Sequence, residues 1–307
     1  MFPAVCTLML FAGCNHEPSA NSQQPLFKLL QPEQTHVDFA NTLTEGLNTN
    51  VLMYEYFYNG GGVAVGDLNG DGLQDLYFTG NMTDNKLYLN QGNMQFKDIT
   101  ADAGVAGRPG PWKTGVTMAD VNGDGKLDIY ICYSGKVRAE KRVNQLFINQ
   151  GNNAAGVPMF KDLTADFGLD FPSFSTQAYF FDYDRDGDLD LLLINHNPGR
   201  ISIMDDAFVK EMSAKRDNES GIRLLRNDNN HFTDVTVGAG IINTPLSYGL
   251  AAGIADINGD GWPDIYVSND YSIPDRLYIN NGKGSFADEL QKQIGHSSFY
   301  SMGNDVA

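Results

Sequence analysis

The chain lacks the features of disulfide-rich, membrane-spanning and nucleic-acid-binding proteins. Three cysteines in 307 residues cannot make a disulfide framework. No apolar run reaches the roughly 18 residues of a membrane-spanning helix. Basic residues are scarce, with 21 Lys and Arg against 38 Asp and Glu and a formal net charge of −17. This charge disfavours nucleic acid and anionic membrane surfaces as partners, and it favours cations.

Motifs of common enzyme classes are also missing. The sequence has no glycine-rich phosphate loop, no Gly-x-Ser-x-Gly and no His-Glu-x-x-His. Its five His residues share no ligand spacing, and no His/Cys cluster suits zinc. We expect Cys132, in an apolar run, to be a small core residue, and His196 to be a polar residue of a loop after a strand. We therefore predict that the protein is not an enzyme.

The composition is that of a globular protein rich in turns. Hydrophobic residues make up 42% and aromatic residues 11% of the chain, which excludes disorder of the whole chain. The 33 glycines indicate many tight turns. The length corresponds to one large domain or two ordinary ones.

The N-terminus has the pattern of an export signal. Residues 1–13 are uncharged and mostly apolar, and they end in Phe-Ala-Gly directly before Cys14 and a polar stretch. This end resembles a bacterial lipoprotein signal, in which the cysteine is lipidated. The sequence therefore predicts a lipoprotein anchored at Cys14 at a bacterial outer membrane or cell surface, with a secreted or periplasmic protein as the alternative. Residues 14–49 are expected to form a polar tether and lead-in.

A nine-residue acidic pattern recurs four times, at intervals of roughly 50 to 75 residues. Its consensus is Asp-x-Asn/Asp-x-Asp-Gly-x-x-Asp, and the copies begin at Asp67, Asp120, Asp182 and Asp256. A strand-like run precedes each copy, usually of small residues, and three further strand-like runs with Gly and Asn turns follow. Units of about four short strands are typical of β-propeller blades, whose inner edges crowd the central axis. The predicted fold is therefore all-β, a β-propeller of four-stranded blades over residues 50–307.

Each acidic pattern gathers oxygen ligands around one point. Positions 1, 3, 5 and 9 offer carboxylate or amide oxygens, position 7 can offer its carbonyl, and Gly at position 6 permits the sharp turn. Six to eight oxygens suit Ca²⁺, whereas Mg²⁺ takes fewer protein ligands. We therefore predict about four structural Ca²⁺ ions. The predicted ligands are Asp67, Asn69, Asp71, Leu73 and Asp75; Asp120, Asn122, Asp124, Lys126 and Asp128; Asp182, Asp184, Asp186, Asp188 and Asp190; and Asp256, Asn258, Asp260, Trp262 and Asp264.

Two alternatives to these calcium loops are less favoured. An EF-hand needs Glu at position 12 and a helix on each side, but position 12 is apolar in all four copies and both flanks are strand-like. Solvated acidic turns without metal would leave three or four carboxylates in mutual repulsion. The third loop carries one acid more than the others, so we expect it to bind most tightly.

The four loops resemble the FG-GAP/VCBS repeats of integrin-α-type β-propellers. The approach to the first loop at residues 59–67, and the segments Phe-x-Asp-[Ile/Leu/Val]-Thr…Ala-Gly-[Val/Ile] at 96–105 and 232–241, resemble more closely the ASPIC/UnbV-associated, cartilage-acidic-protein-like family. The resemblance implies a seven-bladed propeller that is calcium-bound and extracellular. In many bacteria such proteins are surface lipoproteins of unassigned function, and no ASPIC/UnbV domain is visible here.

Four acidic loops account for about four blades. Gly303 aligns with Gly62 and Gly115, and the chain ends where the first Asp of a fifth loop would stand. We therefore expect this chain to be the N-terminal part of a longer protein, so that its propeller is incomplete.

Together these features predict an exported calcium-binding scaffold for protein or glycan binding at the cell surface. Its partner would be an extracellular protein or glycan, its contact with a membrane would be through the lipid anchor alone, and nucleic acid is not expected. The alternative is a polysaccharide-active propeller enzyme, lyase-like, that uses bound calcium to acidify a substrate proton. That enzyme would need a base beside an incompletely coordinated ion, and the four loops are all of one type.

Overall fold

A computed structural model describes residues 26–199, 205–271, 273–298 and 300–306. The chain divides into two units, Met1–Gln31 and Pro32–Ala307, and the second contains every strand discussed below. The predicted signal peptide and Cys14 lie outside the described residues. Within those residues, no helix has the length and apolar character needed to cross a membrane.

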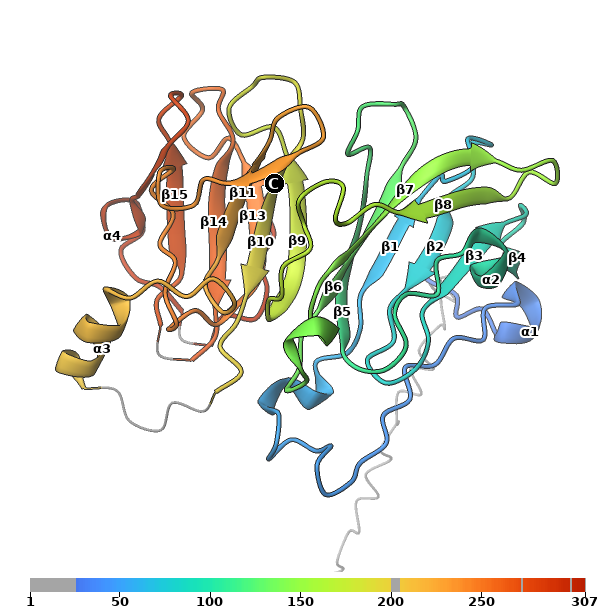
Figure 1. The fold of residues 1–307 in the computed structure, drawn as a ribbon, viewed down its shortest axis with the longest axis horizontal. Helices are drawn as coiled ribbons and strands as arrows, with labels where there is room; N and C mark the ends of the chain where they lie inside the picture. The colour runs from blue at the N-terminus through green and yellow to red at the C-terminus, as the bar shows by residue number, and fades with distance from the viewer. Residues whose placement is uncertain (1–25, 200–204, 272, 299, 307) are drawn as a thin grey trace, which may run out of the picture. The chain divides into compact units, whose positions relative to one another are not determined.

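The described residues form four antiparallel sheets of four strands each (Figure 1). In every sheet the strands follow one another in chain order, as in a meander. The first sheet contains β1 (Val63–Gly66), β2 (Asp75–Phe78), β3 (Lys86–Asn90) and β4 (Phe96–Asp98), and the second contains β5 (Lys113–Ala119), β6 (Asp128–Tyr133), β7 (Gln145–Asn152) and β8 (Pro158–Asp162). The third contains β9 (Ser175–Phe181), β10 (Asp190–Asn195), β11 (Arg223–Asn227) and β12 (Phe232–Asp234), and the fourth contains β13 (Gly249–Ala255), β14 (Asp264–Asn269), β15 (Arg276–Asn280) and β16 (Phe286–Asp288).

Short helices precede, connect and follow these strands. The longest, α3, precedes β11, and its first turn is capped by the Asp205 carboxylate, which accepts a hydrogen bond from the backbone N–H of Phe208. The helices of the described residues are α1 (Pro32–Thr35), η1 (Glu55–Tyr58), α2 (Thr100–Ala103), η2 (Ala139–Lys141), α3 (Asp206–Ser213) and α4 (Leu290–Gln293).

Consecutive sheets share hydrophobic cores, which makes them blades of a propeller-type fold. Tyr77 of the first sheet and Ile131 of the second lie in one core, and Leu192 of the third and Val267 of the fourth lie in another. A core between the second and third sheets includes Cys132, which is fully buried as expected. The first strands of neighbouring blades lie beside one another. This arrangement confirms the predicted all-β fold of four-stranded blades.

Glycine is required where the first strands converge. A Cβ atom on Gly62 would lie 2.7 Å from the backbone nitrogen of Val116, and one on Gly115 would lie 2.5 Å from the backbone oxygen of Thr176. Real Cβ atoms do not approach backbone atoms this closely. The small-residue runs therefore lie at a crowded inner edge, as the sequence predicted.

The Phe-x-Asp-x-Thr segments fasten the fourth strand of a blade to its third. In the first blade Phe96 is buried, and Asp98 Oδ1 accepts a hydrogen bond of 2.6 Å from the Thr100 hydroxyl. The same hydroxyl oxygen accepts the backbone N–H of Leu87 at 2.8 Å. Thr164 and Thr236 repeat both contacts in the next two blades. The motif is thus a structural fastening between strands.

The residues before the first blade pack on it. The ring of Phe39 stacks on Phe78 with centroids 5.0 Å apart, and the Tyr88 hydroxyl donates to the Asp38 carboxylate at 2.7 Å. The compact unit begins at Pro32 and includes this lead-in. Asp38 and Phe39 thus attach the end of this segment to the first blade.

An aromatic segment around η1 joins three blades. The Tyr54 hydroxyl lies 3.4 Å from the Ser134 hydroxyl and 3.2 Å from Nε2 of His196, and the Tyr56 hydroxyl donates to Asp270 at 3.2 Å. His196 follows β10 directly and is fully buried, so it is not a solvated turn residue. The rings of Tyr54, Tyr56 and Phe174 surround it.

The burial of His196 makes one contribution to stability that depends on pH. Burial lowers the pKa of His196 to about 3, whereas in an unfolded chain it is about 6.5. At this residue only the unfolded state gains a proton as pH falls below 6.5, so the contribution of His196 to stability is lost from there toward pH 3. We expect the unfolding free energy of wild type, relative to that of His196→Gln, to fall by up to about 1.4 kcal/mol for each pH unit below 6.5.

Urea unfolding at pH 7, 6 and 5 tests this expectation. The exposed His231 serves as the control, because the curve of His231→Gln against pH should stay parallel to that of wild type. Parallel pH curves for wild type and His196→Gln would contradict the assignment.

Candidate metal centres

Each acidic pattern folds into a tight loop between the first and second strands of its blade. In the first loop the Asp67 carboxylate accepts backbone N–H groups of Gly70 and Gly72, both at 2.8 Å, and of Asp71 at 3.2 Å. Gly72, at position 6, has a φ of 84°, in the left-handed region that favours glycine. Position 6 of the other loops is likewise a positive-φ glycine: Gly125, Gly187 and Gly261. The loop closes around its first carboxylate in all four blades.

Positions 3 and 5 lie close together within the loop. The Asn69 side chain accepts the backbone N–H of Asp71 at 3.1 Å and donates to the Asp71 carboxylate at 3.0 Å. The fourth loop repeats this pair with Asn258 and Asp260. The predicted ligands at positions 1, 3 and 5 are therefore brought together by local hydrogen bonds.

The Asp at position 9 clamps the loop to the third strand. Asp75 is fully buried, and its two oxygens accept the backbone N–H groups of Leu68 at 2.9 Å and Asn90 at 2.8 Å. The same pair of contacts recurs at the buried carboxylates of Asp128, Asp190 and Asp264. Sequence reasoning assigned this residue to metal alone and missed its second role.

Burial also changes the ionisation of these clamping carboxyls. It raises the pKa of Asp75 and of Asp128 to about 6, and that of Asp190 to about 7. The backbone N–H donors lower each value and the neighbouring loop carboxylates raise it. A bound cation would favour the ionised form of each group.

The third loop brings carboxylates closest together. Asp182, Asp184 and Asp190 each offer one oxygen, and these oxygens lie within 4.8 Å of one another. Oδ1 of Asp184 is buried and has no hydrogen-bond partner among the described residues. Burial raises the pKa of Asp184, and the neighbouring Asp186 raises it further. This donor set of hard oxygens, one of them unsatisfied, fits a divalent cation such as Ca²⁺.

Position 7 makes the same backbone contact in all four loops, but its side chain differs from loop to loop. The backbone N–H of Leu73, Lys126, Asp188 and Trp262 donates to the carboxylate at position 5. The Lys126 ammonium also pairs with Asp124 at 2.9 Å, so this predicted ligand residue neutralises part of its own loop. The guanidinium of Arg185 lies 4.6 Å from the Trp262 ring centroid, which links the third loop to the fourth.

In the second, third and fourth blades, a buried asparagine at the end of the third strand bonds the acidic loop of the preceding blade. The Asn149 amide donates to the Leu68 carbonyl at 2.9 Å, Asn227 donates to Val121 at 3.4 Å, and Asn280 donates to Tyr183 at 2.9 Å. Each accepting residue stands at position 2 of an acidic loop. The sequence showed this asparagine only as a recurring turn residue, because its acceptor lies about 80 to 106 residues away.

These bridges predict that substitution of Asn149 lowers the unfolding free energy more than substitution of Asn90. Asn149→Ala leaves the buried carbonyl of Leu68 unpaired, which costs roughly 1–3 kcal/mol of unfolding free energy. Asn90→Ala is the matched control, because its amide bonds only the carbonyl of Gln74 in its own blade. Urea unfolding of both variants measures the difference, and equal losses would argue against the bridging role.

Comparisons with known proteins are consistent with this repeat architecture. A family profile described as FG-GAP-like repeat matches residues 56–131, 212–267 and 256–307. Cartilage acidic protein 1 from Mus musculus is 26% identical over 246 residues, the Homo sapiens protein 25% over 244, and the Xenopus tropicalis protein 27% over 250. These matches cover 78–79% of this chain and 33–34% of each relative, so the chain spans about a third of their length.

A search of solved structures finds a lectin from Agrocybe aegerita, whose title reports specific recognition of non-reducing terminal N-acetylglucosamine. The match has a TM-score of 0.37 and 20% sequence identity. It covers 73% of this chain and 49% of the lectin.

Proposed function

The chain belongs to the family of FG-GAP-like repeat proteins, and we propose that it is a calcium-stabilised scaffold that binds an extracellular protein or glycan. Its blades form a propeller-like repeat scaffold. The proposed role is binding and not catalysis. The burial of His196 supports this role, because a fully buried imidazole is not accessible to a polysaccharide.

The carboxylate trio of the third loop carries the calcium proposal. Three carboxyl oxygens within 4.8 Å repel one another when ionised, and a divalent cation would remove that repulsion. The unpartnered Oδ1 of Asp184 would gain a ligand. In this loop the side chains of Asp182, Asp184, Asp186 and Asp190 and the carbonyl of Asp188 would hold the ion.

Calcium at this loop would act on more than the loop itself. Asp190 also accepts the backbone N–H of Asn227, which ends the third strand of the same blade. Tyr183, at position 2, accepts the amide of Asn280 from the next blade. An ion that orders the loop would therefore stabilise strand pairing and the contact between blades. Because it would bind only the folded state, it would raise unfolding free energy with its concentration.

Thermal unfolding of the full chain tests the calcium proposal. We expect the melting temperature of protein freed of metal by EDTA to rise by several degrees in about 1 mM Ca²⁺, since saturation well above Kd adds about 3–4 kcal/mol. Identical melting curves with and without Ca²⁺ would overturn it.

A pair of variants locates the ion. Asp184→Asn removes a ligand charge and should weaken one calcium site about tenfold in calorimetric titration, because a charged ligand attracts the ion more strongly than an amide. Asp188→Asn removes one charge from the same loop but leaves the carbonyl ligand in place, and serves as the control. Equal weakening in both variants would contradict the proposed coordination.

We also propose that the protein is exported and anchored by a lipid at Cys14, on the sequence pattern of residues 1–14. Cys14→Ala should abolish incorporation of labelled palmitate and release the protein into soluble fractions. Cys6→Ala is the control, because Cys6 lies within the segment that is removed. Equal labelling of wild type and Cys14→Ala would reject the anchor.

A further inference from the structure

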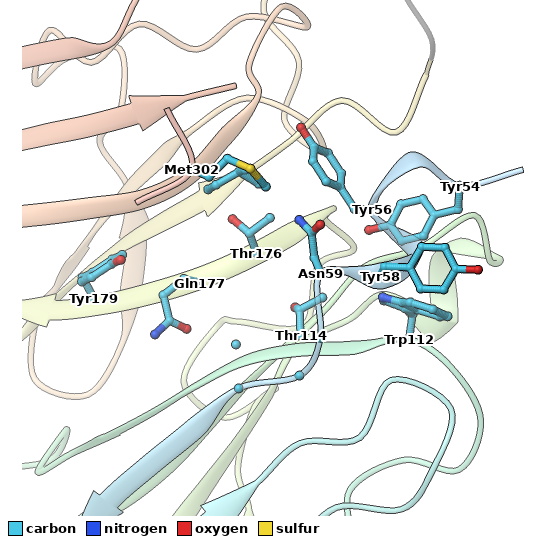
Figure 2. Close-up of a pocket in the computed structure, with 15 residues that line it drawn as sticks. Tyr54, Tyr56, Tyr58, Asn59, Trp112, Thr114, Thr176, Gln177, Tyr179 and Met302 are labelled. Atoms are coloured by element: carbon cyan, nitrogen blue, oxygen red, sulfur yellow. The ribbon is translucent and has the colours of Figure 1, made fainter. Parts of the chain in front are cut away.

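A cavity of about 570 Å³ lies where the first strands of the four blades begin (Figure 2). Its walls include Thr114 of β5, Gln177 and Tyr179 of β9, Leu250 of β13, and the segment 54–62 that leads into β1. Every blade thus contributes to it. Its volume falls within the roughly 300–1,000 Å³ of small-molecule sites.

The cavity is electrically neutral in a strongly acidic chain. None of the described residues that line it carries a charge, although the sequence holds 38 Asp and Glu. An anion or a cation would lose its hydration there without meeting a counter-charge. The ligand class that fits is therefore uncharged.

Aromatic rings form one wall, and their positions are fixed before any ligand binds. Tyr54 and Tyr56 are held through their hydroxyls by Ser134, His196 and Asp270. The Trp112 ring packs edge-on to Tyr54 with centroids 5.4 Å apart. Each of these rings is only 5–6% exposed, so each offers a small but rigid apolar contact at little cost in conformational entropy.

The opposite side of the cavity holds an unsatisfied polar atom. Oε1 of Gln177 is buried and has no hydrogen-bond partner among the described residues. Gly115 leaves the room for this side chain, because a Cβ there would collide with the same oxygen. Figure 2 shows Gln177, Thr176 and Asn59 around the cavity. A buried acceptor without a donor is costly. Because Gly115 covers this oxygen, the Gln177 amide would have to turn toward the cavity to accept a ligand hydroxyl.

We propose that this cavity binds one uncharged sugar residue of a glycan. A pyranose ring presents apolar C–H groups to aromatic rings and hydroxyl groups to amide oxygens, which matches the two sides of the cavity. Gln177 would accept a sugar hydroxyl, and Asn59 would supply a second amide. The lining has no carboxylate among the described residues, so it offers no carboxyl pair for glycoside hydrolysis. The proposal rests on the scaffold function above and names its ligand class.

Tryptophan fluorescence of the full chain, saturated with Ca²⁺, tests the proposal. The chain has two Trp residues, and Trp262 lies outside the cavity, so Trp262→Phe leaves Trp112 as the reporter. The probes are the methyl glycosides of glucose, galactose, mannose and N-acetylglucosamine, with methyl glucuronide as the charged counterpart and N-acetylalanine methylamide as a neutral peptide unit. We expect saturable binding of at least one neutral glycoside, and at least tenfold weaker binding of the glucuronide.

Two variants assign the binding to this cavity. In the Trp262→Phe background, Gln177→Leu keeps most of the side-chain volume but removes the acceptor, and it should weaken glycoside binding about tenfold. Asn59→Ala, at an exposed position, should weaken it without affecting the fold. Gln91→Leu, in the exposed turn after β3, is the matched control and should bind as the background does.

Failure to bind any neutral glycoside, or equal binding by Gln177→Leu and Gln91→Leu, would overturn the proposal. Equal affinity for the peptide unit would also overturn it and would indicate a peptide ligand. If Ca²⁺ raises the melting temperature but no glycoside binds, the sugar site fails and the calcium scaffold stands. If glycosides bind but Ca²⁺ has no effect, the calcium proposal fails and the sugar site stands.

Discussion

A buried carboxylate that accepts two backbone N–H groups holds each blade together. Asp75 and its three counterparts join the second residue of an acidic loop to the end of the third strand. Both oxygens are thereby satisfied, which makes burial of a carboxyl group tolerable. Burial still disfavours its charge, as the raised pKa of Asp190 shows. A cation in the loop would stabilise the charged form of this carboxylate. The same carboxylate would therefore serve both metal binding and the closure of the blade.

The residue that bonds this carboxylate at the end of the third strand also connects neighbouring blades. The strand-end asparagine whose N–H binds the carboxylate sends its side chain to the previous loop, as Asn149 does to Leu68. One residue thus closes its own blade and contacts its neighbour. In repeat proteins much of the stability lies in such neighbour interfaces. Order in one loop is therefore transmitted to the next through hydrogen bonds, and between the third and fourth loops also through Arg185 and Trp262.

The two proposed sites differ in charge and lie at different places in the blades. The acidic loops lie between the first and second strands and concentrate carboxylates, whereas the neutral cavity lies at the opposite ends of the first strands. Close approach of those strands, which Gly62 and Gly115 permit, shapes the cavity walls. The segment around Tyr54 and Tyr56 then supplies the rings. A structural metal and a neutral ligand would therefore not compete for the same residues.

Four short strands in each repeat, the glycine-lined inner edge and the loop glycines could be predicted from the sequence, because each depends on residues close in the chain. The pattern from Asp182 to Asp190 likewise identified the loop in which carboxylates lie closest. The burial of His196 and the bridge from Asn280 to Tyr183 could not be predicted, since their partners lie about 97 to 142 residues away. The cavity around Gln177 was hidden for the same reason. Local periodicity determined the blades, and only the packing of blade against blade decided which polar atoms are bridged, buried or left for a ligand.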